Sequence, residues 1–251
     1  MLTKKIVPCI DIKDGKVVKG INFKGNREVG DPVELAALYN SEGADELVFY
    51  DITASIENRG VFADLLRRVA DVVTIPLTVA GGVNTIDDFA RLLELGASKV
   101  SINSGALKNP GLIEDCAKKF GSERVVFAMD VKRVGESYMV FARGGANGGE
   151  SSGIDAIDWA KRGEASGAGE IVVNSIDTDG VKNGFDITML GKIAEHVNTP
   201  LVASGGAGKM EHFLEVFRAV PTVQSGLAAS IFHYREVSIR ELRKYLEENG
   251  I

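Results

Sequence analysis

Short runs of apolar residues alternate along this chain with longer segments in which apolar and polar residues are mixed. Residues 6–11 form a run that is apolar up to its last residue, Asp11, and residues 125–130 repeat the pattern up to Asp130. An apolar run without polar alternation is typical of a strand that is buried on both faces, as in a parallel sheet. We therefore predict buried parallel strands at both places.

The same pattern over the whole chain predicts eight strands, each followed by a helix. The strands are expected at 6–11, 46–51, 77–82, 99–103, 125–130, 170–174, 201–204 and 223–227. The helices are expected at 31–43, 62–73, 85–95, 109–121, 153–166, 186–197, 209–219 and 238–248. Asp31 before Pro32 is one of the helix-start signals. A polar loop at 22–30, and a hairpin at 138–141 with a Gly-rich loop at 144–149, are expected between these elements.

Eight strand–helix units in one uninterrupted run predict a closed α/β barrel. The chain has 251 residues, close to the ~250 residues of a typical closed (βα)8 TIM barrel. A doubly wound open sheet would need fewer strands or a break between domains. We therefore expect a single (βα)8 barrel domain over residues 1–251, and a generic α/β fold is the alternative.

The chain also contains an internal repeat. Residues 43–48 match residues 167–172 at an offset of 124, and the segment 75–82 matches 199–206 at the same offset. Repeats of this kind indicate a duplicated structural unit. We expect two similar half-barrels, approximately 1–122 and 123–251.

Two of the predicted strands end in an aspartate, Asp11 and Asp130, whose carboxylate is not required for packing. The C-terminal ends of parallel strands are where such proteins bind ligands and carry out catalysis. The two residues belong to the first and fifth strands, which lie on opposite sides of an eight-stranded barrel, and two carboxylates in different environments can serve as acid and base. A structural role is the alternative, and Asp51, Asp177 and Asp179 are further acids at this end.

Two Gly-Gly turns follow the third and seventh strands. The pairs are Gly81-Gly82 and Gly205-Gly206, and the next strands end in Asn103-Ser104 and Ala229-Ser230. Without a Cβ atom, such a turn lets backbone N–H groups approach an anion closely. One turn alone would be read as a tight connection, but two equivalent copies favour two phosphate sites. The predicted ligand carries a phosphate at each end.

Charged residues gather where strands begin, at the bottom of the predicted barrel. They are Lys5, Glu46, Lys99 and Glu170. This face of a barrel usually serves stability, so a cluster of salt bridges is one interpretation. Charges that point at the axis would instead guard an opening there.

Composition excludes several function classes. The formal net charge of −6 does not suggest a surface that binds nucleic acid. The first residues do not predict a signal peptide, and no apolar stretch reaches ~18 residues, so we expect no membrane span and a cytoplasmic location. Cys9 and Cys116, together with three widely spaced histidines, form neither a disulfide framework nor a metal-ligand pattern. We expect no metal and no cofactor.

Several specific motifs, spread over nearly the whole chain, resemble the family of cyclase subunits of imidazole glycerol phosphate synthase. They are Pro-Cys-Ile-Asp-Ile-Lys-Asp-Gly at 8–15, Gly-Ala-Asp-Glu-Leu at 43–47, Asp-Ile-Thr-Ala-Ser at 51–55, Ala-Ser-Gly-Gly-Ala-Gly at 203–208 and Glu-His-Phe at 211–213. The resemblance implies a (βα)8 enzyme of histidine biosynthesis that works with a glutaminase subunit at the N-terminal face of the barrel. Ammonia from glutamine would convert a phosphoribulosyl-formimino aminoimidazole carboxamide ribonucleotide into imidazole glycerol phosphate and aminoimidazole carboxamide ribonucleotide.

The resemblance also implies roles for individual residues. Asp11 would be the general acid and Asp130 the base, while Lys19 would close over the substrate. The first phosphate site would use Gly82, Asn103 and Ser104, and the second Gly180, Gly206, Ala229 and Ser230, with Asp179 nearby. Lys5, Glu46, Lys99 and Glu170 would form the gate through which ammonia enters.

Some positions depart from the family pattern. Lys5 stands where the gate commonly has Arg, so its pairing is expected to be looser, and Ser98 replaces an acidic neighbour of Lys99. Residues 219–226 are unusual, which affects the register of the eighth strand. The chain ends before the usual C-terminus of the family, and we expect activity to be retained at lower stability.

Two alternatives to the cyclase stay open at this point. The isomerase of the preceding pathway step shares the duplication and the doubly phosphorylated ligand, but it needs no ammonia and therefore no gate. A non-catalytic barrel that binds phosphate ligands, or serves as a scaffold, is the other.

Overall fold

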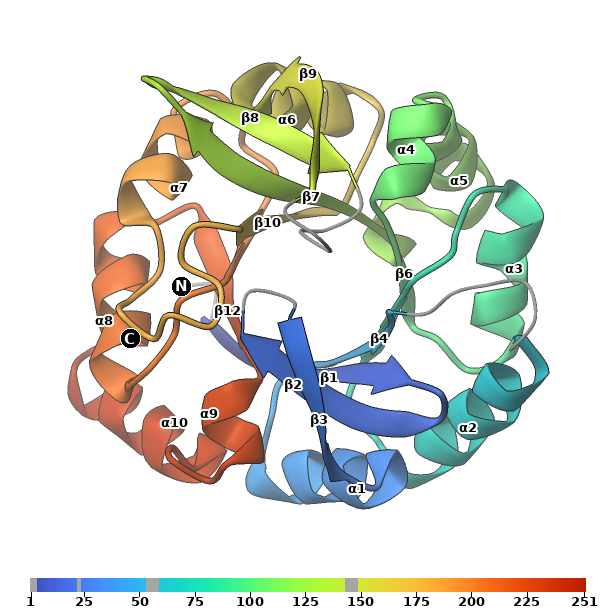
Figure 1. Cartoon of the computed structure of the whole chain (residues 1–251), viewed down its shortest axis with the longest axis vertical. Helices are drawn as coiled ribbons and strands as arrows, with labels where there is room; N and C mark the ends of the chain where they lie inside the picture. The colour runs from blue at the N-terminus through green and yellow to red at the C-terminus, as the bar shows by residue number, and fades with distance from the viewer. Residues whose placement is uncertain (1–3, 22–23, 53–58, 143–148) are drawn as a thin grey trace.

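The computed structural model of the chain describes residues 4–21, 24–52, 59–142 and 149–251, with side chains except at 19–21, 24–27 and 59–61. Within these ranges, eight parallel strands close into a barrel (Figure 1). In barrel order they are β1 (Lys5–Lys13), β4 (Leu47–Asp51), β5 (Leu77–Ala80), β6 (Lys99–Ile102), β7 (Val125–Val134), β10 (Glu170–Ser175), β11 (Leu201–Ser204) and β12 (Val223–Ala228). Pairing of β12 with β1 and of β7 with β10 completes the ring. The predicted (βα)8 TIM barrel is confirmed.

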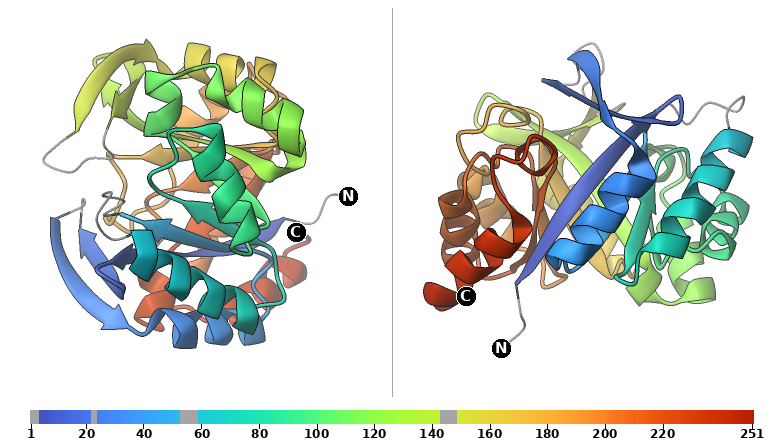
Figure 2. Two further views of the ribbon diagram at one scale, coloured as in Figure 1. Left: turned by 90° about the vertical axis from the view of Figure 1, so that its right-hand side faces the viewer. Right: turned by 90° about the horizontal axis from the view of Figure 1, so that it is seen from below.

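Helices surround the barrel between successive strands (Figure 2). They are α1 (Pro32–Glu42), α2 (Arg59–Val72), α3 (Ile86–Glu94), α4 (Ser104–Lys108), α5 (Leu112–Phe120), α6 (Ala156–Ala165), α7 (Ile187–Ala194), α8 (Met210–Ala219), α9 (Ser230–His233) and α10 (Ile239–Glu248), with a short 3-10 helix at Ser122–Arg124. Helix α1 begins as predicted, because the Asp31 side chain accepts hydrogen bonds from two backbone N–H groups and proline occupies the first turn. No helix in the described ranges is long and apolar enough to cross a membrane.

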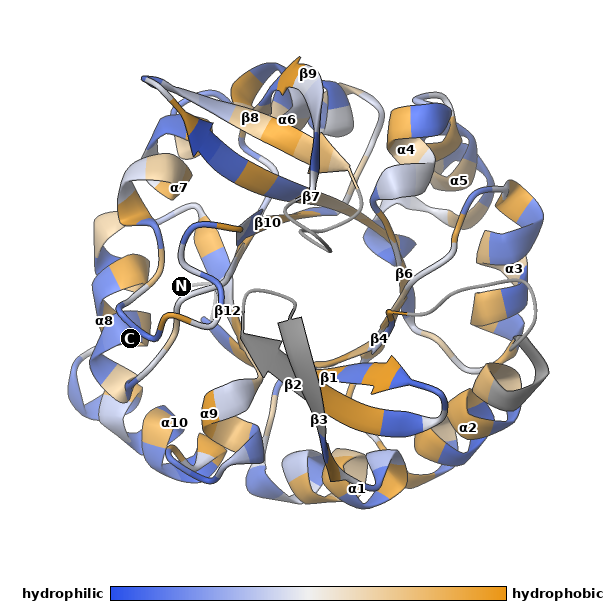
Figure 3. Ribbon diagram, in the orientation of Figure 1, coloured by the Kyte–Doolittle hydropathy of each residue, from blue (hydrophilic) through white to orange (hydrophobic). Residues whose placement is uncertain are grey.

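The two faces of each barrel strand serve different purposes. Along β1, Ile6 and Ile10 are fully buried in the hydrophobic core between strands and helices, whereas Cys9 and Asp11 line a cavity inside the barrel. This alternation follows from the two-residue period of a strand. The helices carry apolar and polar residues side by side (Figure 3), as expected for elements with one face on the core and one in water.

Strands β1 and β7 run past the barrel rim into antiparallel excursions, which project from the end of the barrel opposite the C-terminus (Figure 2). The first contains β2 (Lys16–Ile21) and β3 (Lys24–Gly30), and the second β8 (Ser137–Ala142) and β9 (Glu150–Asp155). The hairpin expected at 138–141 is confirmed.

Two expectations in these excursions are wrong. The polar loop expected at 22–30 is strand β3 from Lys24 onward, because its backbone pairs with β2 although its residues are poor strand formers. The helix expected from residue 153 begins at Ala156, because the preceding residues pair with β8 and Asp155 caps the helix. The loop expected at 144–149 lies almost wholly outside the described residues.

The two excursions lead into helices that begin alike. Asp31 and Asp155, at the offset of 124 found in the sequence, each cap the following helix by accepting hydrogen bonds from backbone N–H groups at the second and third positions after them. The same unit of barrel strand, excursion and capped helix therefore occurs twice. This equivalence supports the division into half-barrels at about residue 122, which stays a prediction.

Candidate active site

A cavity of about 530 Å³ opens at the C-terminal ends of the barrel strands. Asp51 and Asp177, named above as further acids at this end, do not line it. The cavity gathers the aspartate pair and every residue assigned to the two phosphate sites. These residues are Asp11, Gly82, Asn103, Ser104, Asp130, Asp179, Gly180, Gly206, Ala229 and Ser230. Lys19 lies in β2, and its side chain is outside the described part of the chain.

Asp11 and Asp130 face the cavity from opposite sides. Asp11 lies on β1 and Asp130 on β7, and three strands separate β1 from β7 in either direction around the ring. This is the arrangement expected from their positions in the first and fifth strands. A ligand that crosses the cavity therefore passes between two carboxylates.

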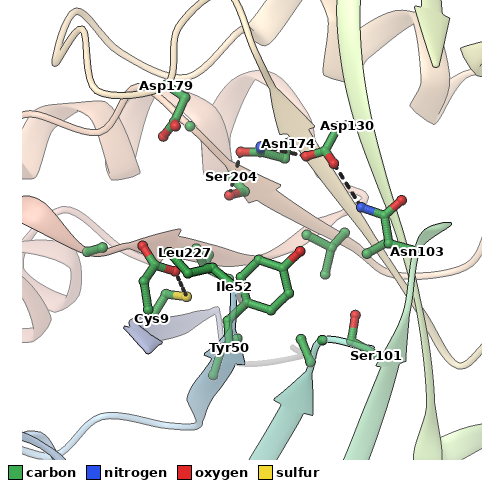
Figure 4. A pocket seen from close by; sticks show the side chains of 18 of the residues that line it. Cys9, Tyr50, Ile52, Ser101, Asn103, Asp130, Asn174, Asp179, Ser204 and Leu227 are labelled. Atoms are coloured by element: carbon green, nitrogen blue, oxygen red, sulfur yellow. Dashed lines mark hydrogen bonds between the residues drawn. The ribbon is translucent and has the colours of Figure 1, made fainter. Parts of the chain in front are cut away.

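Asp130 is buried and held by two amides (Figure 4). The Asn103 side chain donates a hydrogen bond to one carboxylate oxygen at 2.8 Å, and the Asn174 side chain donates to the other at 2.8 Å. Burial raises the pKa of the Asp130 carboxyl above its usual value, and the hydrogen bonds from Asn174 and Asn103 counteract part of that rise. Buried and hydrogen-bonded, this acid has the environment of a proton-transfer group.

Asn174 and Ser204 were not found by sequence reasoning. They lie side by side on β10 and β11, and the Ser204 hydroxyl donates a hydrogen bond to the Asn174 side-chain oxygen at 2.9 Å. Both line the cavity. Their position at the ends of predicted strands could have suggested that they line the site. Their hydrogen bonds could not be predicted, because these depend on the register between neighbouring strands.

Tyr50 is a second residue that the sequence analysis missed. It pairs with Asp11 in the register of β1 and β4, and its ring lies in the cavity (Figure 4). Burial, followed by the charges of Asp130 and Asp11, raises the pKa of the Tyr50 hydroxyl above its ordinary value. Tyr50 is therefore a neutral hydrogen-bond donor close to both carboxylates. The Cys9 thiol lies 3.6 Å from an Asp11 oxygen.

The Gly-Gly turns border the cavity on two sides. All four glycines have positive φ. A Cβ atom on Gly81 would lie 2.3 Å from the Asp51 carbonyl oxygen, and one on Gly206 would lie 2.0 Å from the Gly184 carbonyl oxygen. Close backbone packing thus requires glycine at both positions, independently of any ligand. Ser104 and Ser230 follow the neighbouring strands and line the cavity from corresponding places.

The four charged residues at the bottom of the barrel form one ion-pair cluster. The Lys99 ammonium lies 2.7 Å from Glu46 and 2.8 Å from Glu170, whereas the Lys5 ammonium is 3.7 Å and 3.3 Å from the same carboxylates. Lys5 therefore pairs less closely with these carboxylates than Lys99 does. Burial lowers the pKa of Lys99, but the carboxylates of Glu46 and Glu170 outweigh it and raise that pKa.

Thr78 connects this cluster to the cavity. Its side chain is buried, lines the cavity and donates a hydrogen bond to Glu46. The residues between the two ends that line the cavity include small and medium side chains such as Val48, Ser101 and Ala128. The cavity therefore reaches from the strand ends down to a residue that touches the ion pairs.

Comparison with known proteins agrees with the motifs. The family model described as "Histidine biosynthesis protein" matches residues 5–238. The chain is 50% identical to imidazole glycerol phosphate synthase subunit HisF of Streptococcus mutans over 251 residues, covering 100% of this chain and 99% of the relative. It is 51% identical to HisF of Hydrogenobaculum over 251 residues (100% and 98%) and 52% identical to HisF of Campylobacter concisus over 248 residues (99% and 96%). The chain therefore belongs to the family of HisF cyclase subunits of imidazole glycerol phosphate synthase, an enzyme of histidine biosynthesis.

Proposed function

We propose that Asp11 and Asp130 form the acid–base pair of the cyclase reaction. Ammonia would react with the phosphoribulosyl-formimino aminoimidazole carboxamide ribonucleotide to give imidazole glycerol phosphate and aminoimidazole carboxamide ribonucleotide. A nitrogen that attacks a carbon centre must lose protons, and the amine that departs must gain one. Asp130, whose two amide donors favour the ionised form, suits the base, and Asp11 suits the acid.

One observation carries this proposal, namely the order of the strands around the barrel. The two proposed phosphate sites follow β5 and β6 on one side and β11 and β12 on the opposite side. The line that joins these sites crosses the line from β1 to β7 in the barrel mouth. A substrate anchored by a phosphate at each end would thus place its reacting middle between Asp11 and Asp130.

The anchors proposed for the phosphates are the turn and strand-end groups on each side of the cavity. The first site comprises Gly82, Asn103 and Ser104, and the second Gly180, Gly206, Ala229 and Ser230 with Asp179 nearby. The Asn103 side chain already contacts Asp130, so its contribution to the phosphate would come from its backbone N–H. Lys19 is proposed to close over the bound substrate.

The subunit name of the relatives implies a complex with a partner subunit. We propose that the partner is a glutaminase that docks on the N-terminal face of the barrel in the cytoplasm. Its ammonia would pass the cluster of Lys5, Glu46, Lys99 and Glu170. The hydrogen bond from Thr78 to Glu46 supports this route, because Thr78 also lines the cavity.

The role of Asp11 is tested with the isolated chain, the ribulosyl substrate and an ammonium salt. We expect the unmodified chain to form imidazole glycerol phosphate, and Asp11→Asn to lose turnover while its affinity for the substrate, measured by calorimetry, changes little. The substitution removes the proton donor but keeps the shape of the side chain. Robust turnover in the variant would refute the role of Asp11. The unmodified chain is also given the un-isomerised precursor of this substrate. Conversion of the precursor alone would identify an isomerase, and conversion of neither compound would indicate a scaffold.

A further inference from the structure

We infer that Asn174, oriented by Ser204, is a positioning residue that keeps the Asp130 carboxylate ionised and in one orientation. The inference rests on the proposed function, in which Asp130 is the base. It goes beyond that function because it assigns a task to two residues that were assigned to neither proposed phosphate site nor the ion-pair cluster.

The contacts form a chain across three neighbouring strands. Asp130 on β7 is paired in register with Asn174 on β10, and Asn174 is paired with Ser204 on β11. All three side chains point into the cavity at one level of the barrel (Figure 4). The hydrogen bonds that join them measure 2.8 Å and 2.9 Å.

Ser204 supports the orientation in which the amide nitrogen of Asn174 faces Asp130. A hydroxyl donates to the amide oxygen, so the amide nitrogen of Asn174 is left to face the carboxylate. With the opposite orientation, the amide oxygen would meet the carboxylate oxygen and the two would repel each other. The serine hydroxyl thus holds the donor in place.

Asn103 completes the arrangement from the other side. It comes from the end of β6, and its amide donates to the second oxygen of Asp130. Each carboxylate oxygen therefore accepts one N–H, which fixes the plane of the carboxylate and leaves its remaining lone pairs toward the cavity.

The amides matter because, among the described residues, no cationic side chain acts on the buried Asp130 carboxyl. Within the described ranges, the other acidic groups that line the cavity are Cys9, Asp11, Tyr50 and Asp179, and none of them carries a positive charge. Among the described residues that line the cavity, Lys13 has the cationic side chain, and it lies on β1 on the far side. Ionisation of Asp130 then depends on its two amide donors, since burial alone favours the neutral acid.

The test compares Asn174→Ala and Ser204→Ala with the unmodified chain. Ammonia-dependent turnover is measured from acidic to alkaline pH at saturating substrate, with the concentration of free ammonia held constant. Loss of the Asn174 donor should raise the pKa of Asp130 further, so turnover should fall about tenfold at the acidic end and recover as pH rises. Ser204→Ala should change the profile in the same direction by less. Asn198→Ala, which removes an exposed amide, should leave the profile unchanged.

Two outcomes would overturn the inference. One is a loss in Asn174→Ala that is equal at every pH, with a melting temperature like that of the unmodified chain. The other is an unchanged profile. Asp130→Asn separates this inference from the proposed function: if Asp130→Asn keeps its turnover, the role of Asp130 as base fails. If it is inactive while the profile of Asn174→Ala does not move, only the inference fails.

Discussion

Tyr50 brings a neutral hydroxyl to the space between the two aspartates. The raised pKa of this hydroxyl keeps the proton in place at physiological pH. We expect Tyr50→Phe to lower kcat/KM for the ammonia-dependent reaction about fivefold, the effect of losing one neutral hydrogen bond of ~1 kcal/mol to the substrate. Steady-state kinetics would measure it. Tyr245→Phe on α10, outside the cavity, is the matched control, and equal kinetics of both variants would argue against a contact with Tyr50.

At the scale of single residues, the sequence could predict which side chains end a strand, because a polar residue after an apolar run is visible in one dimension. Asp11 and Asp130 were predicted in this way, and both line the cavity. Asn174 was not, since its importance comes from pairing with Asp130 and Ser204 on the two neighbouring strands. That register is a property of the closed barrel and not of any one segment.

At the scale of elements, packing of the turn after β11 against a neighbouring loop makes Gly206 intolerant of a side chain. We expect Gly206→Ala to destabilise the fold by about 1–3 kcal/mol, because φ is +106° and the added Cβ would meet the Gly184 carbonyl oxygen. Thermal unfolding would show a lower midpoint. Gly191→Ala in α7 is the control: nothing lies within 4 Å of its added Cβ, so the better helix former should stabilise by about 0.5–1 kcal/mol. Equal midpoints for both variants would contradict the packing argument.

Barrel strands could be predicted because burial on both faces leaves a mostly apolar run, as in β5, whose four residues are all buried and, apart from Thr78, apolar. The excursion strands could not. Residues 24–30 and 150–155 are mostly polar, and they become strands because β1 and β7 extend past the rim and offer a free edge for pairing. The short helices α4 and α9 were missed for a similar reason, since too few residues are present to show a period.

At the scale of the whole molecule, the strand order places the proposed acid–base pair at one end of the barrel and an ion-pair cluster at the other. The cavity joins them through Thr78, which contacts Glu46. A cluster that only stabilised the barrel would affect every activity of the protein in proportion to the folded fraction. A cluster that admits ammonia would affect only the reaction in which ammonia arrives from below.

Lys99→Ala distinguishes these two roles. The substitution removes the shorter ion pairs of Glu46 and Glu170 and leaves both carboxylates paired with the more distant Lys5. In a complex with the proposed glutaminase partner, glutamine-dependent turnover should fall more than turnover with ammonium salt, because free ammonia can also enter from the open end of the barrel. The stability cost should stay below the ~3–5 kcal/mol of breaking a fully buried pair, since Lys5 remains. Lys118→Ala, which removes an exposed helical ion pair with Glu114, should leave the ratio of the two activities unchanged. Equal losses of both activities in Lys99→Ala would show that the cluster serves the fold and not the passage of ammonia.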